Sequence, residues 1–271
     1  MRIVRYGIEG REGRGVIEPS PAGDLVRAFG PDEKGDNTAG DVVARLDEVT
    51  LLAPCDPRTI VCVGSNYASQ VEEKGRPWPD RPALFLKSPN SVIGPEAAIE
   101  APPEVERLEY EGELAVVIGT LARSVRREDA MDHVLGFTCA NDVTAHDWRA
   151  DGQWARAKSA DTFCPLGPWI ETEPPESVAL TVTTRLGDRV VQQSGAERMI
   201  FGVDTILAYV TRWITLRPGD VVLTGSPAGV GPMVPGDRVT VEIDGVGSLS
   251  NPVALRRAHG RPGAARRRDH P

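Results

Sequence analysis

Short apolar runs recur along the chain and alternate with glycine, proline or charged residues. Runs of β-branched and aliphatic residues this short, bounded by turn-forming residues, are typical of β-strands. We expect strands at residues 2–6, 15–18, 25–29, 49–52, 59–64, 108–119, 136–140, 178–185, 190–193, 221–223, 238–243 and 246–249. The pattern therefore predicts a fold that is mostly β.

Helical patterns are confined to a few segments. Residues 127–135 and 204–214 have apolar positions at helical spacing, and a short helix is expected after residue 64, capped by Ser65 or Asn66. On that helix Gln70 and Glu73 would share a face. A polar stretch at residues 30–41 is followed by a short expected helix that ends at residue 47. Residues 144–165 are expected to form a long polar loop, and a loop of that length is usually functional or mobile.

The punctuation of the chain suggests three parts. Prolines at positions 54 and 57 end a small N-terminal β-rich module, residues 1–53. Residues 54–253 form the main domain, and residues 254–271 are expected to be a disordered, arginine-rich tail.

Glu111 and Glu113 lie at the entrance of an apolar strand. Residues two apart on a strand project from the same face, roughly 7 Å apart. Two like charges at that edge are costly unless a cation lies between them, and carboxylate oxygens suit Mg²⁺, Mn²⁺ or Ca²⁺. Asp142 follows the next expected strand and would complete a three-carboxylate site. The alternative is that one glutamate faces water at a strand end.

Composition and charge narrow the function class. The net charge is −8, and residues 256–271 hold six arginines and one aspartate, so the remaining chain carries −13. An acidic body argues against nucleic acid as the main partner. The four cysteines show no metal-ligand spacing. We see no signal peptide and no apolar run long enough to cross a membrane, and we expect a cytoplasmic protein.

Several ordered sequence blocks resemble the fumarylacetoacetate hydrolase family. They are Gly64-x-Asn66-Tyr67, Tyr110-Glu111-Gly112-Glu113-Leu114, Asn141-Asp142-Val143-Thr144-Ala145, Gln153-Trp154-x-Arg156-Ala157-Lys158-Ser159, Pro165-Leu166-Gly167-Pro168-Trp169, Pro218-Gly219-Asp220-Val221 and Thr224-Gly225-x-Pro227-Ala228-Gly229. The resemblance extends over about residues 58–253. The resemblance implies an α+β fold, a mixed β-sandwich roll that acts as the catalytic domain, and a homodimer.

The resemblance also implies roles for individual residues. Glu111, Glu113 and Asp142 match the metal carboxylates of the family, with Mg²⁺ or Mn²⁺ as the expected ion and Ca²⁺ as a third candidate. Lys158 matches its active-site lysine. Substrate contacts are implied for Thr224, Gly225, Gln192 and Tyr67.

Two positions depart from the family pattern. Hydrolases of the family usually carry histidine in place of Gln70, paired with the glutamate that is Glu73 here, and that histidine takes a proton from water. An amide is not a useful base near neutral pH. His146 stands where the family has arginine. Metal binding therefore looks intact while the water-activating pair is broken, unless Glu73 or His146 acts as the base.

Three functions follow. The first is metal-dependent C–C bond hydrolysis of 2-oxo or 1,3-dicarbonyl acids such as acylpyruvates. The second is isomerisation, tautomerisation or decarboxylation through a stabilised enolate on the same scaffold, which needs no activated water. The third is a non-catalytic relative that binds a keto acid, and the intact carboxylates and Lys158 argue against it.

Overall fold

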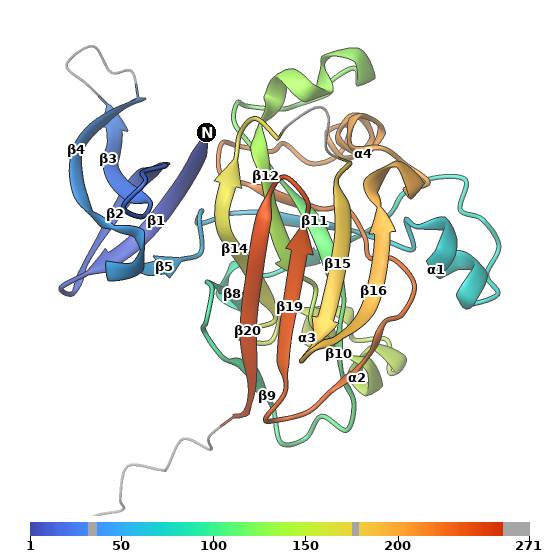
Figure 1. The fold of residues 1–271 in the computed structure, drawn as a ribbon. Coiled ribbons are helices and arrows are strands. Elements are labelled where there is room, and N and C mark those ends of the chain that lie inside the picture. Colours follow the sequence, from blue (N-terminus) through green and yellow to red (C-terminus); the bar gives the residue numbers. More distant parts are fainter. Residues whose placement is uncertain (32–36, 175–178, 257–271) are drawn as a thin grey trace, which may run out of the picture.

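Three β-sheets and four α-helices make up the part of the chain that the computed structural model describes, residues 1–31, 37–174 and 179–256 (Figure 1). The prediction of a mostly β, α+β fold is confirmed. Each expected strand overlaps a strand of the structure, although the one expected at residues 108–119 is divided into two. Most of the predicted tail, residues 257–271, lies outside the described residues.

The largest sheet has twelve strands in the order β4-β3-β2-β1-β14-β12-β11-β17-β6-β7, with β5 beside β1 and β8 beside β14. Its strands are β1 (Arg2–Ile8), β2 (Arg11–Glu18), β3 (Leu25–Pro31), β4 (Asn37–Arg45), β5 (Thr50–Leu52), β6 (Ile60–Gly64), β7 (Ala83–Lys87), β8 (Val92–Ile93), β11 (Gly112–Ile118), β12 (Val134–Asn141), β14 (Cys164–Glu171) and β17 (Val221–Leu223).

The N-terminal strands β1–β5 continue this sheet rather than forming one of their own. β1 pairs antiparallel with β14, and Ile3 lies opposite Ile170. The helix expected to end at residue 47 is wrong, because residues 37–45 pair with β3 as strand β4 and only the 3₁₀ turn Leu46–Glu48 follows. The boundaries of the module and of the main domain stay predictions.

A second sheet of five strands packs against the middle of the first (Figure 1). Its order is β16-β15-β19-β20-β9, and its strands are β9 (Ile99–Ala101), β15 (Thr181–Leu186), β16 (Arg189–Gly195), β19 (Arg238–Ile243) and β20 (Gly247–Leu255). Apolar side chains of β11, such as Leu114 and Val116, share one buried cluster with Val182 of β15 and Val241 of β19. Burying such side chains contributes about 1.5–3 kcal/mol each.

The third sheet is small and interrupts the expected strand at residues 108–119. β10 (Leu108–Tyr110) pairs with β13 (Thr144–Ala145) and β18 (Gly231–Met233), whereas β11 pairs with β12 and β17. The chain therefore leaves one sheet and enters another at Glu111. That residue lies between the two strands and not inside a single one.

The helices are short, with five to eight residues each. They are α1 (Ala68–Glu73), α2 (His146–Ala150), α3 (Trp154–Ser159) and α4 (Val203–Val210), with further 3₁₀ turns at Pro89–Ser91, Arg127–His133 and Ala196–Arg198. The residue before α1 is Tyr67, so the expected caps Ser65 and Asn66 lie before the helix start. Residues 144–165 are not a structureless loop, because they contain β13, α2, α3 and the start of β14.

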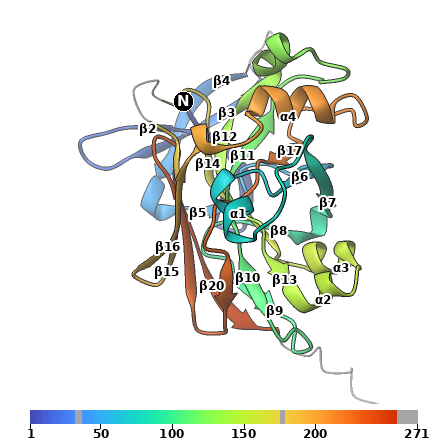
Figure 2. The same ribbon diagram turned by 90° about the vertical axis from the view of Figure 1, so that its right-hand side faces the viewer.

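Helices α1, α2 and α3 gather on one side of the molecule, as both views show (Figures 1 and 2). They lie near the ends of β11, β12 and β7, where the functional residues meet. No helix among the described residues is both long enough and apolar enough to cross a membrane.

Candidate active site

Three buried carboxylates meet where β10 and β12 end and β11 begins. Glu111, Glu113 and Asp142 each offer an oxygen, and these oxygens lie within 4.8 Å of one another. The β11–β12 pairing places Gly112 opposite Asn141, so the two acidic segments are adjacent. The Asp142 N–H donates to the Glu111 carbonyl at 2.8 Å, which holds them together. The structure thus brings together the three carboxylates that the sequence proposed as metal ligands.

Two buried lysines pair with these carboxylates. Lys158, from α3, donates to Glu111 Oε1 at 2.9 Å and to Asp142 Oδ2. Lys87, the last residue of β7, donates to Asp142 Oδ1 at 2.6 Å and to the Val143 carbonyl at 3.1 Å. Both lysine side chains are fully or almost fully buried, and buried charges require such partners. Three carboxylates and two ammonium groups leave a formal charge of −1.

No sequence motif pointed to a role for Lys87. A lysine at the end of an apolar strand ordinarily turns into solvent, because long charged side chains are rarely buried without a partner. Its partner Asp142 lies 55 residues away along the chain, so no local signal pointed to the pair.

The neighbouring charges set the protonation of the cluster. Burial raises the pKa of Glu111, but the charge of Lys158 and hydrogen bonds from Thr144 and Lys158 outweigh it and lower that pKa to about 2. Burial, with the charges of Asp142 and Glu111, raises the pKa of Glu113 well above its ordinary value. Burial lowers the pKa of Lys158, but Asp142 and Glu111 outweigh it and raise that pKa. Glu113 therefore holds a proton more readily than Glu111 in the metal-free site.

The glycine-containing turn after β17 supports the carboxylates. Gly225 N–H donates to Glu113 Oε2 at 2.7 Å, and its φ of 96° lies in the left-handed region that favours glycine. A Cβ at this position would come within 2.8 Å of Asn66 Cβ and 2.9 Å of the Val63 carbonyl oxygen. Ser226 Oγ lies 3.4 Å from Glu111 Oε2.

The side chains of Gln70 and Glu73 have different hydrogen-bond partners and do not form a pair. Gln70 is buried and donates through Nε2 to Ser226 Oγ at 3.1 Å, which links it to the carboxylate cluster. Glu73 is exposed and accepts from Gly229 N–H at 3.1 Å. Among the described residues, Gln70 lines the carboxylate cavity, whereas Glu73 does not.

His146 lies at the start of α2, outside the carboxylate cavity. Its Nδ1 is 2.9 Å from Arg149 Nη2 and 3.2 Å from Glu109 Oε2. The side chain is 43% exposed and lines a hollow further out. It does not line the cavity of the carboxylates, so its role stays a prediction.

Three residues expected to contact the substrate, Thr224, Gln192 and Tyr67, do not line the carboxylate cavity. Two of them are hydrogen-bonded to the protein backbone. Thr224 Oγ1 donates to the Leu114 carbonyl at 2.9 Å. Gln192 accepts from Gly112 N–H at 3.0 Å and donates to the Pro227 carbonyl at 2.9 Å, so both ends of its amide are used. Tyr67 is fully buried before α1. Their roles toward a substrate stay predictions.

The cavity above the carboxylates is small, about 40 Å³, and narrow enough to hold only a few water molecules. Phe85 and Trp154 form an aromatic wall, with ring centroids 5.5 Å apart. The cavity is lined by Val63, Gly64, Ser65, Gln70, Lys74, Arg76, Phe85, Glu111, Glu113, Asp142, Arg149, Trp154, Lys158 and Ser226.

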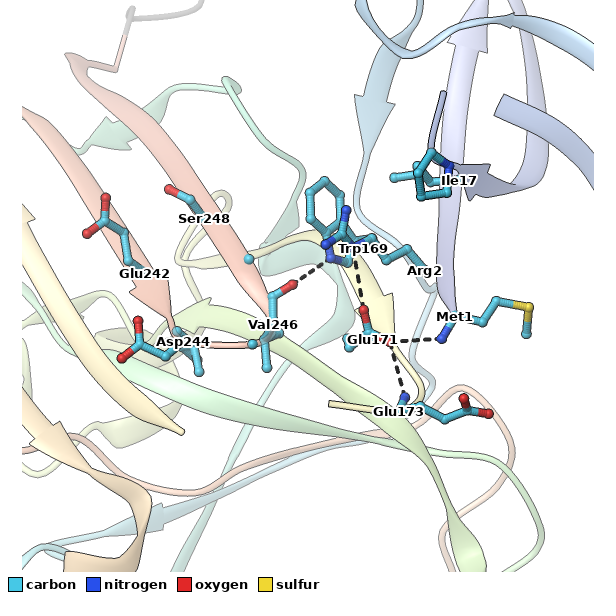
Figure 3. Close-up of a pocket in the computed structure, with 14 residues that line it drawn as sticks. Met1, Arg2, Ile17, Trp169, Glu171, Glu173, Glu242, Asp244, Val246 and Ser248 are labelled. Carbon is cyan, nitrogen blue, oxygen red and sulfur yellow. Dashed lines mark hydrogen bonds and ion pairs between the residues drawn. The ribbon is translucent and has the colours of Figure 1, made fainter. Parts of the chain in front are cut away.

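A larger hollow, of about 670 Å³, lies between the N-terminal strands and the β19–β20 turn (Figure 3). Two hydrogen bonds tie its walls together. The Met1 amine donates to Glu171 Oε1 at 2.9 Å, and Trp169 Nε1 donates to the Val246 carbonyl at 2.6 Å. It contains none of the residues expected to act in catalysis.

The donor set of the carboxylate cluster fits a hard divalent cation. It offers three carboxylates and no sulfur or imidazole, which is the ligand chemistry that Mg²⁺ and Mn²⁺ prefer. Two of these carboxylates are bonded to Lys158, so a bound cation would share them with an ammonium group or displace it.

Known proteins resemble this chain over nearly its whole length. The family model for the fumarylacetoacetate (FAA) hydrolase C-terminal domain matches residues 59–254. The mitochondrial oxaloacetate tautomerase FAHD2A of Bos taurus is 39% identical, over 93% of this chain and 91% of its own. A crystal structure of 5-carboxymethyl-2-hydroxymuconate delta-isomerase from Mycobacterium smegmatis has a TM-score of 0.85 at 37% identity and covers 94% of this chain and 100% of its own.

A neighbour named as a hydrolase is also similar. Fumarylacetoacetate hydrolase from the psychrophilic Exiguobacterium antarcticum has a TM-score of 0.82 at 36% identity, covering 94% of this chain and 100% of its own. The matched domain includes all three carboxylates and both buried lysines. The chain is therefore a member of the fumarylacetoacetate hydrolase family.

Proposed function

We propose that the protein is a divalent-metal-dependent tautomerase or isomerase that interconverts the keto and enol forms of a 2-oxo acid. The observation that carries this proposal is the place of Gln70, whose amide lies on the cavity wall and donates to Ser226. No histidine among the described residues lines the same cavity, and Glu73 is turned to Gly229. Activation of water for C–C bond hydrolysis thus lacks an evident base, whereas enolisation needs no attacking water and requires only an acceptor for the C3 proton, such as a solvent water molecule.

Glu111, Glu113 and Asp142 would hold Mg²⁺ or Mn²⁺, with Ca²⁺ as a third candidate. A cation bound there supplies a Lewis acid for the negative charge that develops on a substrate oxygen. The names of two relatives support tautomerisation or isomerisation as the reaction. FAHD2A of Bos taurus is named an oxaloacetate tautomerase, and the Mycobacterium smegmatis neighbour is named a delta-isomerase.

Lys158 is the chain's own electrostatic contribution. Its Nζ lies between Glu111 and Asp142, and these charges raise its pKa, so it keeps its proton near neutral pH. A fixed ammonium group beside the reacting atoms donates to the oxygen on which charge develops, and burial strengthens that interaction. The narrow cavity limits the access of water to the reacting carbon.

C–C bond hydrolysis of acylpyruvate-like acids is the second candidate. It is supported by the similarity to the Exiguobacterium antarcticum hydrolase. It requires a base in place of the expected histidine, for which Glu73 and His146 remain the proposed residues. We also propose a homodimer, as the resemblance implies.

The test follows oxaloacetate with added Mg²⁺ or Mn²⁺. Enol absorbance and the exchange of C3 hydrogen in D₂O report tautomerisation, and CO₂ release reports decarboxylation. Glu113→Ala should lose metal binding and, with it, the acceleration of enolisation. Undiminished metal affinity in this variant would refute the site. Rapid acylpyruvate cleavage by the wild-type protein, with no catalysed enolisation, would refute the proposed reaction.

A further inference from the structure

A hollow of about 300 Å³ adjoins the carboxylate cavity on its outer side. We call it the outer hollow, and it is lined by Arg76, His146, Arg149, Ala150 and Trp154. Arg76, Arg149 and Trp154 line the inner cavity as well, so the two spaces meet at these side chains. A molecule bound at the carboxylates can therefore extend into the outer hollow.

The outer hollow has an excess of positive charge. In the described parts of the chain, neither Arg76 nor the nearby Lys74 has a carboxylate within 4.0 Å. Arg149 has carboxylate oxygens only at 3.8 Å, on Glu109, and at 3.9 Å, on Glu111. Both distances exceed a hydrogen bond. Glu109 also accepts from Arg107 at 2.8 Å, so its single charge is shared and offsets only part of the charge of Arg149.

Lys74 is a second cation near the hollow whose charge lacks a close carboxylate among the described residues. It is partly buried, and burial lowers its pKa from the ordinary lysine value. An ammonium group that is desolvated without a close partner is costly, and an anion in the same cavity would offset that cost.

Arg149 is held in a position to contact a bound molecule. Its Nη2 lies 2.9 Å from His146 Nδ1, one helical turn earlier on α2, and its Nη1 lies 3.9 Å from Glu111 Oε1. The Arg149 side chain is 21% exposed and adjoins the carboxylate cluster directly. Its planar group of N–H donors suits a carboxylate, which it can bind through two hydrogen bonds.

We propose that Arg149, assisted by Arg76, binds a second carboxylate of the substrate and makes the site selective for dicarboxylic 2-oxo acids over monocarboxylic ones. The inference rests on the proposed function for the placement of the 2-oxo acid end at the carboxylate cluster. The other end then lies at the junction of the two spaces, where the cations gather. Arg149 and Arg76 are specificity-determining residues in this account.

The test compares two ligands with the same carbon skeleton, one with a free second carboxylate and the other with its methyl ester. 3,3-Difluoro-oxaloacetate has no hydrogen to lose at C3, and its 4-methyl ester keeps the carbon skeleton but not the second carboxylate. Dissociation constants are measured by calorimetry in Mn²⁺, so the readout does not depend on turnover. The wild-type protein should bind the diacid about 10-fold to 100-fold more tightly than the ester, as expected for a charge-assisted hydrogen bond.

Arg149→Gln should reduce this preference at least about tenfold, and Arg149→Lys should keep part of it. Arg76→Gln, at an exposed position that poses no folding problem, should also reduce it. Arg156→Gln is the matched control, because Arg156 lies on α3 over the Trp148 ring and lines neither space. The control should keep the full preference.

Equal binding of the two ligands by the wild-type protein would overturn the inference. Retention of the preference by both Arg149→Gln and Arg76→Gln would also overturn it. Enolisation of oxaloacetate is measured on the same preparations. A protein that prefers the diacid but does not accelerate enolisation would refute the proposed function and leave the carboxylate subsite standing.

Discussion

Replacement of Lys87 by methionine tests whether the buried charges or the apolar packing dominate at the active site. Lys87 is fully buried, and its ammonium group donates to Asp142 Oδ1 at 2.6 Å and to the Val143 carbonyl at 3.1 Å. Methionine is close to lysine in length and volume, so the variant removes a charge and its hydrogen bonds while leaving little cavity. The formal charge of the cluster changes from −1 to −2.

The expected magnitude follows from the burial of both partners. Removing one member of a buried ion pair costs about 3–5 kcal/mol, because the other member is left desolvated. Asp142 keeps its bond to Lys158, so we expect the lower end, about 3 kcal/mol, in the metal-free protein. A more negative cluster should bind a divalent cation more tightly, by roughly tenfold or more at an effective dielectric constant of about 20.

Urea unfolding in EDTA and in excess Mg²⁺ measures both effects. Lys87→Met should lose stability in EDTA and recover about 3 kcal/mol or more when Mg²⁺ exceeds its dissociation constant at least 100-fold. Lys74→Met is the matched control, since Lys74 is only partly buried and its change should cost less than about 1 kcal/mol. Equal stabilities of the wild type and Lys87→Met in EDTA, or a weaker metal affinity of the variant, would refute this electrostatic account.

Two further predictions concern protons. Burial and neighbouring charges raise the pKa of Glu113. As the pH rises from the ordinary glutamate pKa to this raised value, the metal-free protein should lose stability, because the folded state holds a proton that the unfolded state has released. Over the same pH range the Mg²⁺ affinity should rise about tenfold per pH unit, because the cation binds the deprotonated carboxylate. Calorimetry in two buffers of different ionisation enthalpy should detect close to one proton released per Mg²⁺ bound, and release of none would contradict this assignment. Gln70→His should raise metal-dependent acylpyruvate cleavage at least about tenfold, since a positioned base contributes about 10²–10⁴. An unchanged rate would show that another group activates water.

The strands and the acidic cluster could be predicted from the sequence because their signals are local. β6, β11 and β17 are buried apolar runs that end at glycines or at polar turns. Glu111, Glu113 and Asp142 stand at the ends of such runs, and sheet formation brings those ends together. The resemblance of the ordered blocks then supplied their common role.

The elements that were missed depend on distant partners or are too short to show a period. β4 is mostly exposed and has no apolar alternation, so only its pairing with β3 identifies it as a strand. Helices α2 and α3 have five and six residues, fewer than two turns each. The break at Glu111 arises because β10 and β11 pair with different sheets.

The two buried lysines explain how one site can hold a cation and an anionic substrate. Three carboxylates alone would attract a dication strongly but would repel the carboxylate of a 2-oxo acid. Lys87 and Lys158 reduce the cluster to a formal −1, so a bound dication brings it to +1 and favours an anion beside it. A dicarboxylic substrate adds a further negative charge, and the excess cations of the outer hollow lie where that charge would fall. The same reasoning accounts for the burial of two lysines in a chain that has four.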